Sequence, residues 1–178
     1  GLDAFQYRTG KYAPGSCGHG VRHRGAILDH VEPAASMNIY FACSITGGRQ
    51  LESIYQAIVR ALTEDDHEVP TAHLAESGVM ALEAVIDPNE VYSRDIAWIR
   101  ASDALIAEAS TPSHGVGYEI GFALEMGKPV LTLYQEGYKI SKMITGNPHP
   151  KLFVRTYQNP ENAIEQIREF LLQVKKPL

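Results

Sequence analysis

Short apolar runs alternate with longer amphipathic segments along most of this chain of 178 residues. The runs are bounded by glycine, proline or charged residues, and such short runs are typical of buried β-strands. We expect five strands, at Asn38–Cys43, Glu68–Ala72, Asp103–Ala109, Val130–Tyr134 and Leu152–Thr156.

The segments between these runs carry apolar residues with helical spacing. From Leu51 to Leu62 an apolar residue recurs every three or four positions, which predicts one buried helix face. Asp87 followed by Pro88 is typical of a helix start, with a capping side chain and then a proline in the first turn. The predicted helices are Leu51–Leu62, Pro88–Ala101, Gly117–Met126 and Pro160–Val174.

Strands separated by helices of this length imply βαβ units and a parallel sheet. We therefore predict an α/β fold: a single five-stranded, parallel-sheet Rossmann-like (flavodoxin-like) domain with helices on both faces. Ligands of such sheets bind beyond the carboxyl ends of the strands. The loops after the strands Asn38–Cys43 and Asp103–Ala109 are therefore where we expect chemistry.

Residues 1–36 lack any sustained period and are rich in glycine, histidine and arginine. We interpret 1–36 as a flexible N-terminal extension or an artificial leader, and 37–178 as the folded domain. Cys17, His19 and His23 fall in this region, but their spacing matches no familiar zinc site. We expect no bound metal in the protein.

Composition and charge exclude some classes of partner. The chain is 44% hydrophobic and 21% charged, with a net charge of −5, which fits a globular protein with a core. An acidic protein has no electrostatic footprint for a nucleic acid polymer or an anionic membrane. An anionic substrate would have to be bound by individual groups, such as backbone N–H donors, hydroxyls or one arginine. The two cysteines form no disulfide framework, which favours a reducing, cytoplasmic setting.

The loop after the first predicted strand has the character of a phosphate cradle. Two glycines allow a tight turn before a helix start, where free N–H groups attract anions. The loop lacks the lysine ending of a Walker motif, so an ordinary strand–helix turn remains an alternative. The candidate donors in or beside this loop are Ser44, Ile45, Gly47, Gly48 and Arg49.

Two carboxylates are candidates for acid–base or nucleophilic work. Glu119 is expected in the first turn of a helix beside the ligand crevice, as a nucleophile or as a charge that complements the helix N-terminus. Asp95 lies in a helix next to Arg94, as a second catalytic carboxylate or as a solvated ion pair. Cleavage of a glycosidic bond uses such a pair of carboxyl groups. Tyr40 and His73 are candidates for contact with a ligand, and a purely structural role is the alternative for each.

Four segments together resemble one family, the 2′-deoxynucleoside 5′-phosphate N-hydrolases of the nucleoside 2-deoxyribosyltransferase superfamily. They occur in the family's order over roughly residues 38–172. The segments are YFACSITGGR from Tyr40, SRDIAW from Ser93, PSHGVGYEIG from Pro112 and ISKMITG from Ile140.

The resemblance implies roles for individual residues. Glu119 corresponds to the nucleophile that forms a deoxyribosyl ester, Asp95 to the carboxylate that assists the leaving base, and Tyr40 to a tyrosine that supports the nucleophile. Hydroxyls corresponding to Ser44, Ser113 and Ser141 hold the 5′-phosphate. The substrate-binding residues that we expect are Ser44, Ile45, Gly47, Gly48, Arg49, His73, Ser113, Gly115, Gly117, Ser141 and Met143.

The resemblance also implies an activity and an assembly. The expected enzyme is a deoxyribonucleoside 5′-monophosphate N-glycosidase that releases the free base and 2-deoxyribose 5-phosphate and needs no cofactor. In the family Ser141 reaches the neighbouring subunit's site, which implies a homodimer. Two alternatives are a deoxyribosyltransferase that exchanges bases on nucleosides and a nucleotide-binding module without turnover.

Overall fold

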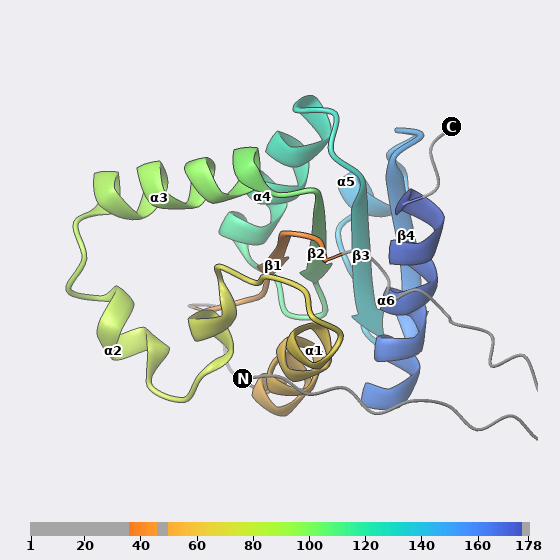
Figure 1. Ribbon diagram of the computed structural model, residues 1–178, viewed down its shortest axis with the longest axis horizontal. Helices are drawn as coiled ribbons and strands as arrows, with labels where there is room; N and C mark the ends of the chain where they lie inside the picture. Colours follow the sequence, from red (N-terminus) through yellow and green to blue (C-terminus); the bar gives the residue numbers. More distant parts are fainter. Residues whose placement is uncertain (1–35, 46–49, 176–178) are drawn as a thin grey trace, which may run out of the picture. The chain divides into compact units, whose positions relative to one another are not determined.

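The computed structural model describes residues 36–45 and 50–175 (Figure 1). The predicted extension 1–36 lies almost wholly outside these residues, and Gly47, Gly48 and Arg49 also lie outside them. The elements are β1 (Ile39–Ala42), α1 (Glu52–Glu64), a 3₁₀ helix η1 (Ala72–Ala75), α2 (Val79–Glu83), α3 (Pro88–Ala101), β2 (Ala104–Glu108), α4 (His114–Glu125), β3 (Val130–Gln135), α5 (Lys142–Thr145), β4 (Leu152–Tyr157) and α6 (Pro160–Lys175).

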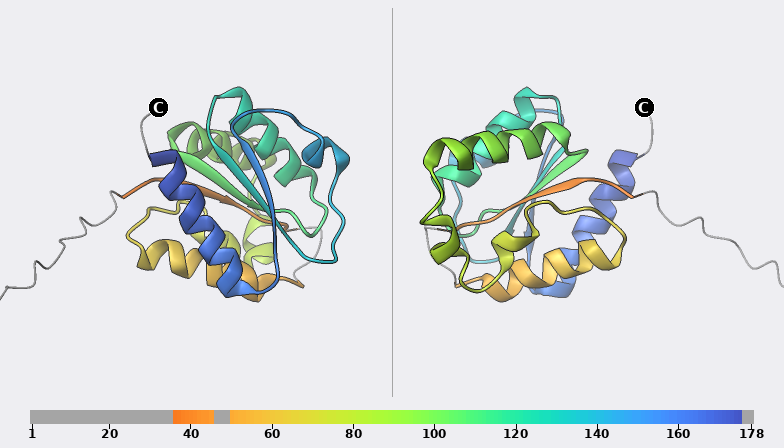
Figure 2. Two further views of the ribbon diagram at one scale, coloured as in Figure 1. Left: turned by 90° about the vertical axis from the view of Figure 1, so that its right-hand side faces the viewer. Right: turned by 60° about the vertical axis from the view of Figure 1, so that its left-hand side comes forward.

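The four strands form one parallel sheet in the order β1-β2-β3-β4. Strands β1 and β2 are buried at every position, as expected for strands covered on both faces. Figure 2 shows the covering layers, with α1 and α6 on one face of the sheet and α3 and α4 on the other. The predicted α/β architecture with helices on both faces is confirmed.

The prediction of a fifth strand at Glu68–Ala72 is wrong for the part of the chain that the structure describes. Only Glu68 pairs with the sheet, through a single parallel bridge to Asn38. Pro70 has no N–H to extend the pairing. Farther along this edge the N–H of Phe41 is bound at 3.0 Å by the hydroxyl of Thr71, so a side chain takes the place of a strand.

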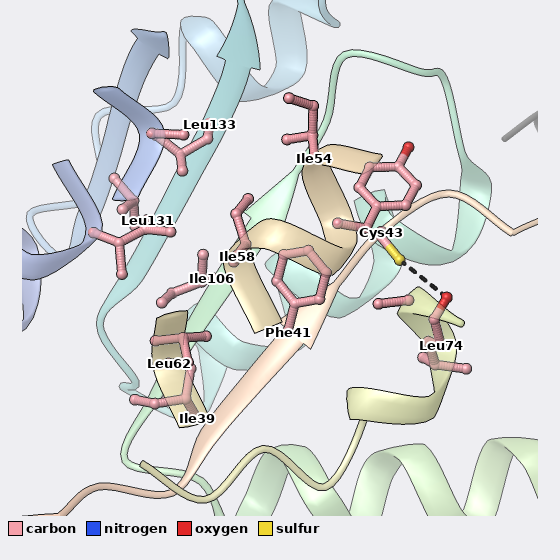
Figure 3. Packing of buried hydrophobic residues seen from close by; sticks show 14 of the residues in the cluster. Ile39, Phe41, Cys43, Ile54, Ile58, Leu62, Leu74, Ile106, Leu131 and Leu133 are labelled. Carbon is pink, nitrogen blue, oxygen red and sulfur yellow. Dashed lines mark hydrogen bonds between the residues drawn. The ribbon is translucent and has the colours of Figure 1, made fainter. Parts of the chain in front are cut away.

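Side-chain alternation along β1 divides the core into two layers. Ile39 and Phe41 face α1 and α6, whereas Tyr40 and Ala42 face α3 and α4. Figure 3 shows the first layer, in which β1 packs against Ile58 of α1 and the Cys43 thiol lies 3.8 Å from the Leu74 carbonyl oxygen. Tyr40 is therefore the large polar side chain that β1 presents to the α3–α4 layer.

Helix starts were predicted with mixed success. Asp87 caps α3 as expected, because its side chain accepts a hydrogen bond from the Asn89 N–H and Pro88 occupies the first turn. Helix α4 begins at His114, three residues before the expected start. The side chain of Ser113 caps it by accepting from the Val116 N–H at 3.4 Å. Glu119 therefore lies in the second turn of α4, not the first.

A fully buried carboxylate, Glu108, lies on the α1–α6 face of the sheet. Glu108 at the end of β2 accepts hydrogen bonds from the hydroxyls of Ser110 and Tyr157. Ser110 in turn accepts from the Gln135 N–H at 2.7 Å. This cluster fixes the loop between β2 and α4 to the end of β3, and so it sets the direction from which α4 starts.

Candidate active site

Tyr40 and Glu119 meet at the centre of the α3–α4 layer. The Tyr40 hydroxyl donates a 2.7 Å hydrogen bond to Oε1 of Glu119, across 79 positions of sequence. Tyr40 is held by the sheet and is fully buried, so its ring has little freedom to move. Glu119 is therefore oriented by a rigid donor.

The electrostatics of this pair favour a carboxyl group that titrates near neutrality. Burial raises the pKa of Glu119 to about 7, the Tyr40 hydrogen bond opposes that rise, and the charge of Asp95 adds to it. Burial, followed by the charges of Glu119 and Asp95, holds the pKa of Tyr40 far above its usual value. Tyr40 therefore remains a proton donor in the hydrogen bond throughout the physiological range.

Asp95 reaches the same region from the middle of α3. Its Oδ1 accepts a 2.9 Å hydrogen bond from Nε of Arg94. Burial raises the pKa of Asp95, while Arg94 opposes the rise. Two carboxyl groups with raised pKa values in one cleft are typical of an acid–base site.

One cavity joins the two carboxylates. Its volume is about 760 Å³, and it opens between the end of β1, η1, α2, α3 and α4. Both Asp95 and Glu119 line it, although they come from different helices. The remaining wall is largely apolar, and it includes Leu74, Ile86 and Val91. This volume and this lining suit a small organic ligand with an apolar part.

A second cavity, of about 730 Å³, lies beside the first between α4 and the α5 segment. Ser113, His114 and Val116 line both cavities. The N-terminus of α4 therefore stands at their junction, where its N–H groups and dipole can hold an anion. Ser141 lines the second cavity and caps α5 by accepting from the Met143 N–H at 3.2 Å.

The predicted substrate-binding residues fall in different places. Ile45 and Gly115 line the first cavity, Gly117 lines the second, and Met143 lines the second with 84% of its surface exposed. Ser44 is fully buried and lines neither cavity. Its hydroxyl has no hydrogen-bond partner among the described residues. Gly47, Gly48 and Arg49 lie outside those residues.

His73 contacts a neighbouring ion pair and lines neither cavity. Its Nε2 lies 3.4 Å from Oε1 of Glu83, and its ring packs edge-on against Trp98. Glu83 lines the first cavity and binds Arg94 through both carboxylate oxygens. Sequence reasoning missed Glu83, because α2 is too short to show a helical period. The one available signal was Arg94 beside Asp95.

The described residues contain no cluster of three or more histidine, cysteine or acidic side chains suited to a metal ion. Within the same residues no helix has the length and the apolar character that crossing a bilayer requires.

Comparison with known proteins places the chain among nucleoside-processing enzymes. The family model for nucleoside 2-deoxyribosyltransferase matches residues 39–164. A zebrafish (Danio rerio) protein named 5-hydroxymethyl-dUMP N-hydrolase is 39% identical over 141 residues, covering 76% of this chain and 98% of the relative. A Methanosarcina mazei protein with the provisional name 2′-deoxynucleoside 5′-phosphate N-hydrolase 1 is 41% identical over 134 residues, covering 75% and 83%.

A solved structure shares the fold. The CMP N-glycosidase of Clostridium botulinum superposes with a TM-score of 0.57 at 21% identity, over 74% of this chain and 98% of the other. At this identity the likeness extends to the fold alone.

Proposed function

The chain belongs to the nucleoside 2-deoxyribosyltransferase family and is an enzyme of the N-glycosidase class; we propose that it hydrolyses 2′-deoxynucleoside 5′-monophosphates. The products are the free base and 2-deoxyribose 5-phosphate. The observation that carries this proposal is that Glu119, held by Tyr40, and Asp95 line one cavity from two different helices.

The two adjoining cavities suggest how the substrate lies. The 5′-phosphate sits at the N-terminus of α4, where Ser113 stands between the cavities and Ser141 lines the second. Backbone N–H groups and hydroxyls can bind a dianion there even though the protein is acidic. The base lies against the apolar wall of the first cavity, and the sugar spans the distance between them.

In the first step Glu119 acts as the nucleophile. A carboxylate oxygen of Glu119 attacks the anomeric carbon, and the bond from that carbon to the base nitrogen breaks. The base leaves with the bonding electron pair and receives a proton from Asp95. The step yields a deoxyribosyl ester on Glu119 and an ionised Asp95.

In the second step water completes the hydrolysis. Its oxygen attacks the anomeric carbon, its proton passes to the Asp95 carboxylate, and Glu119 leaves as a carboxylate. Both side chains thereby return to their starting states. No cofactor enters either step.

We also propose that the enzyme works as a homodimer whose catalytic domain is residues 37–178. Ser141 and Met143 are exposed, and Met143 retains 84% of its surface. A partner subunit that received these side chains would gain a hydroxyl at its phosphate end and would bury an exposed apolar group.

The proposal is tested with a panel of deoxy- and ribonucleotides, each with and without the 5′-phosphate. Release of base is followed by chromatography, and Glu119→Gln protein serves as the blank. We expect turnover of deoxynucleoside monophosphates and at least ~100-fold less without the phosphate, because the contacts to Ser113, Ser141 and the N-terminus of α4 are then lost. Equal rates on nucleosides would contradict the phosphate site, and transfer of the sugar to an added base in preference to water would identify a transferase.

A further inference from the structure

Asp95 belongs to a network of ionic contacts between α3, α2 and η1. Arg94 donates from Nε to Asp95 at 2.9 Å, and from Nη1 and Nη2 to the two oxygens of Glu83, each at 3.1 Å. His73 approaches the same Glu83 at 3.4 Å. The guanidinium also lies over the Trp98 ring, 4.9 Å from its centroid.

This network is not an ordinary surface ion pair. The side chains of Glu83, Asp95 and Arg94 are 13%, 18% and 20% exposed. Water screens such partly buried charges only weakly, so a change in one charge is felt by the others. Glu83 and Asp95 also line the same cavity, which places the network at the reacting end of the site.

The arrangement resolves a conflict in the proposed chemistry. Asp95 must carry a proton to assist the leaving base, yet an arginine bonded to a carboxylate favours its ionised form. Arg94 has two of its three hydrogen bonds on Glu83 and one on Asp95. Its charge is therefore shared with a second carboxylate. Because Arg94 binds Oδ1 of Asp95, the other oxygen, Oδ2, is left for the proton.

We propose that Glu83 is a positioning residue that acts through Arg94 to keep Asp95 both correctly oriented and able to hold a proton. This inference rests on the proposed role of Asp95 as the acid. Glu83 itself need not touch the substrate.

The charges around Asp95 determine in which direction its pKa changes when one of them is removed. Burial raises the pKa of Asp95, Arg94 lowers it, Glu83 raises it and His73 lowers it. Glu119 of α4 and Tyr40 of β1 also face it, since its charge acts on both. The other titratable side chains that line the cavity are Cys43, Tyr92, His114 and Tyr118. Glu83 is the neighbouring carboxylate that can be neutralised while Asp95, Glu119, Tyr40 and the Arg94 cation all stay in place.

The test uses Glu83→Gln, Arg94→Met and the double variant, with Glu169→Gln as a matched control. Glu169 forms a comparable arginine pair with Arg155 at 3.2 Å on the exposed surface. The measurement is kcat/KM against pH for a deoxynucleoside monophosphate that the wild type hydrolyses. Circular dichroism and thermal unfolding verify that each variant folds.

We expect opposite effects from the two single variants. Glu83→Gln leaves Asp95 as the only carboxylate partner of Arg94, so Asp95 gives up its proton at lower pH and kcat/KM at pH 8 falls by roughly 10-fold. Arg94→Met removes the cation, so Asp95 keeps its proton to higher pH. The double variant lies between them, and Glu169→Gln matches the wild type. An unchanged kcat/KM at pH 8 in Glu83→Gln, or changes in the same direction in both single variants, would overturn the inference.

A second measurement does not depend on turnover. Carbon-13 NMR of labelled aspartate, with Asp95→Asn for assignment, follows the titration of Asp95 directly in wild-type and Glu83→Gln protein. A lower pKa of Asp95 in the variant supports the inference, and an unchanged pKa overturns it. If Asp95→Asn keeps the full hydrolytic rate, the role of Asp95 as the acid fails, whatever the NMR shows. If the wild type releases no base from deoxynucleoside monophosphates, the proposed function itself fails.

Discussion

The hydroxyl of Tyr40 and the carboxylate of Glu119 are joined by a 2.7 Å hydrogen bond between the first strand and the fourth α-helix. Tyr40 is fully buried in the α3–α4 layer. A residue of the hydrophobic core thus sets the orientation of the proposed nucleophile and favours its ionised form. Tyr40 therefore contributes both to the packing of the core and to the reactivity of Glu119.

Replacing Tyr40 by phenylalanine is expected to move the acidic limb of the pH profile upward. Without the hydrogen bond the pKa of Glu119 rises above about 7, so less of the nucleophile is ionised in mild acid. We expect kcat/KM at pH 6 to fall by roughly 10-fold, with a much smaller loss at pH 9. The control is Tyr157→Phe, which removes a buried hydroxyl donor from Glu108 on the other face of the sheet. An acidic limb that stays in place in Tyr40→Phe would contradict this role.

Replacing Glu119 by glutamine is expected to abolish turnover while keeping nucleotide binding. The amide retains the shape of the side chain but cannot form the ester, so kcat should fall by roughly 10³-fold or more. Binding of a deoxynucleoside monophosphate, measured by calorimetry, should change little because the phosphate and base contacts remain. Retained turnover would rule out covalent catalysis by Glu119.

The Glu119→Gln variant should be more stable to unfolding than the wild type at alkaline pH. The folded-state pKa of Glu119 is raised from 4.5 to about 7, so the native state bears a cost for ionising it. That cost is absent below about pH 4.5, grows between the two values and is constant above pH 7. We expect Glu119→Gln to gain on the order of 3 kcal/mol at pH 8 and almost nothing at pH 4. Denaturant unfolding at both pH values measures this difference, and an equal gain at both would contradict it.

Ser113→Ala should affect both the phosphate and the helix. Removing the hydroxyl raises KM for monophosphates by about 10-fold, as expected for a lost hydrogen bond to a charged group. It also removes the cap of α4 and costs about 1 kcal/mol of stability. Asp87→Ala separates the two effects, because Asp87 caps α3 and lines neither cavity. An unchanged KM in Ser113→Ala would count against the phosphate site.

Mixed subunits can reveal whether Ser141 serves its own site or that of a partner. Glu119→Gln and Ser141→Ala proteins are each impaired alone. If Ser141 acts across a dimer, a heterodimer of the two carries one site with both changes and one intact site. Random exchange of equal amounts should then restore about a quarter of the wild-type sites. Activity no greater than the average of the parents would place Ser141 in its own subunit's site.

Much of the fold could be predicted from the alternation of apolar runs and amphipathic segments. The strands β1 to β4 and the helices that cover them follow that pattern closely. The expected strand at Glu68–Ala72 failed because Pro70 ends the pairing and the Thr71 hydroxyl binds the edge of β1. The spacing of apolar residues gives no information about a hydrogen bond that a single side chain makes.

The site could be predicted in part, chiefly because four motifs resemble a known family. The structure brings Tyr40, Asp95 and Glu119 together. The position of Glu119 within α4 was misjudged because the helix was predicted to begin at Gly117, whereas His114 and Gly115 already lie inside it. Glu83 was missed, because no sequence pattern links it to Arg94, eleven positions away; the position of Arg94 beside Asp95 was the single indication that a further acidic partner was present.

Ser113 lies where the two cavities meet, so different elements contact the two ends of the substrate. In the proposed orientation, the chamber for the base is walled largely by α2, its connection to α3 and the start of α3, whereas the phosphate is held from α4 and α5. Substitutions in the first set can retune the enzyme toward a different leaving group while the anchor at the other end stays as it is. Such a division allows the preference for the base to change without loss of the contacts that hold the phosphate.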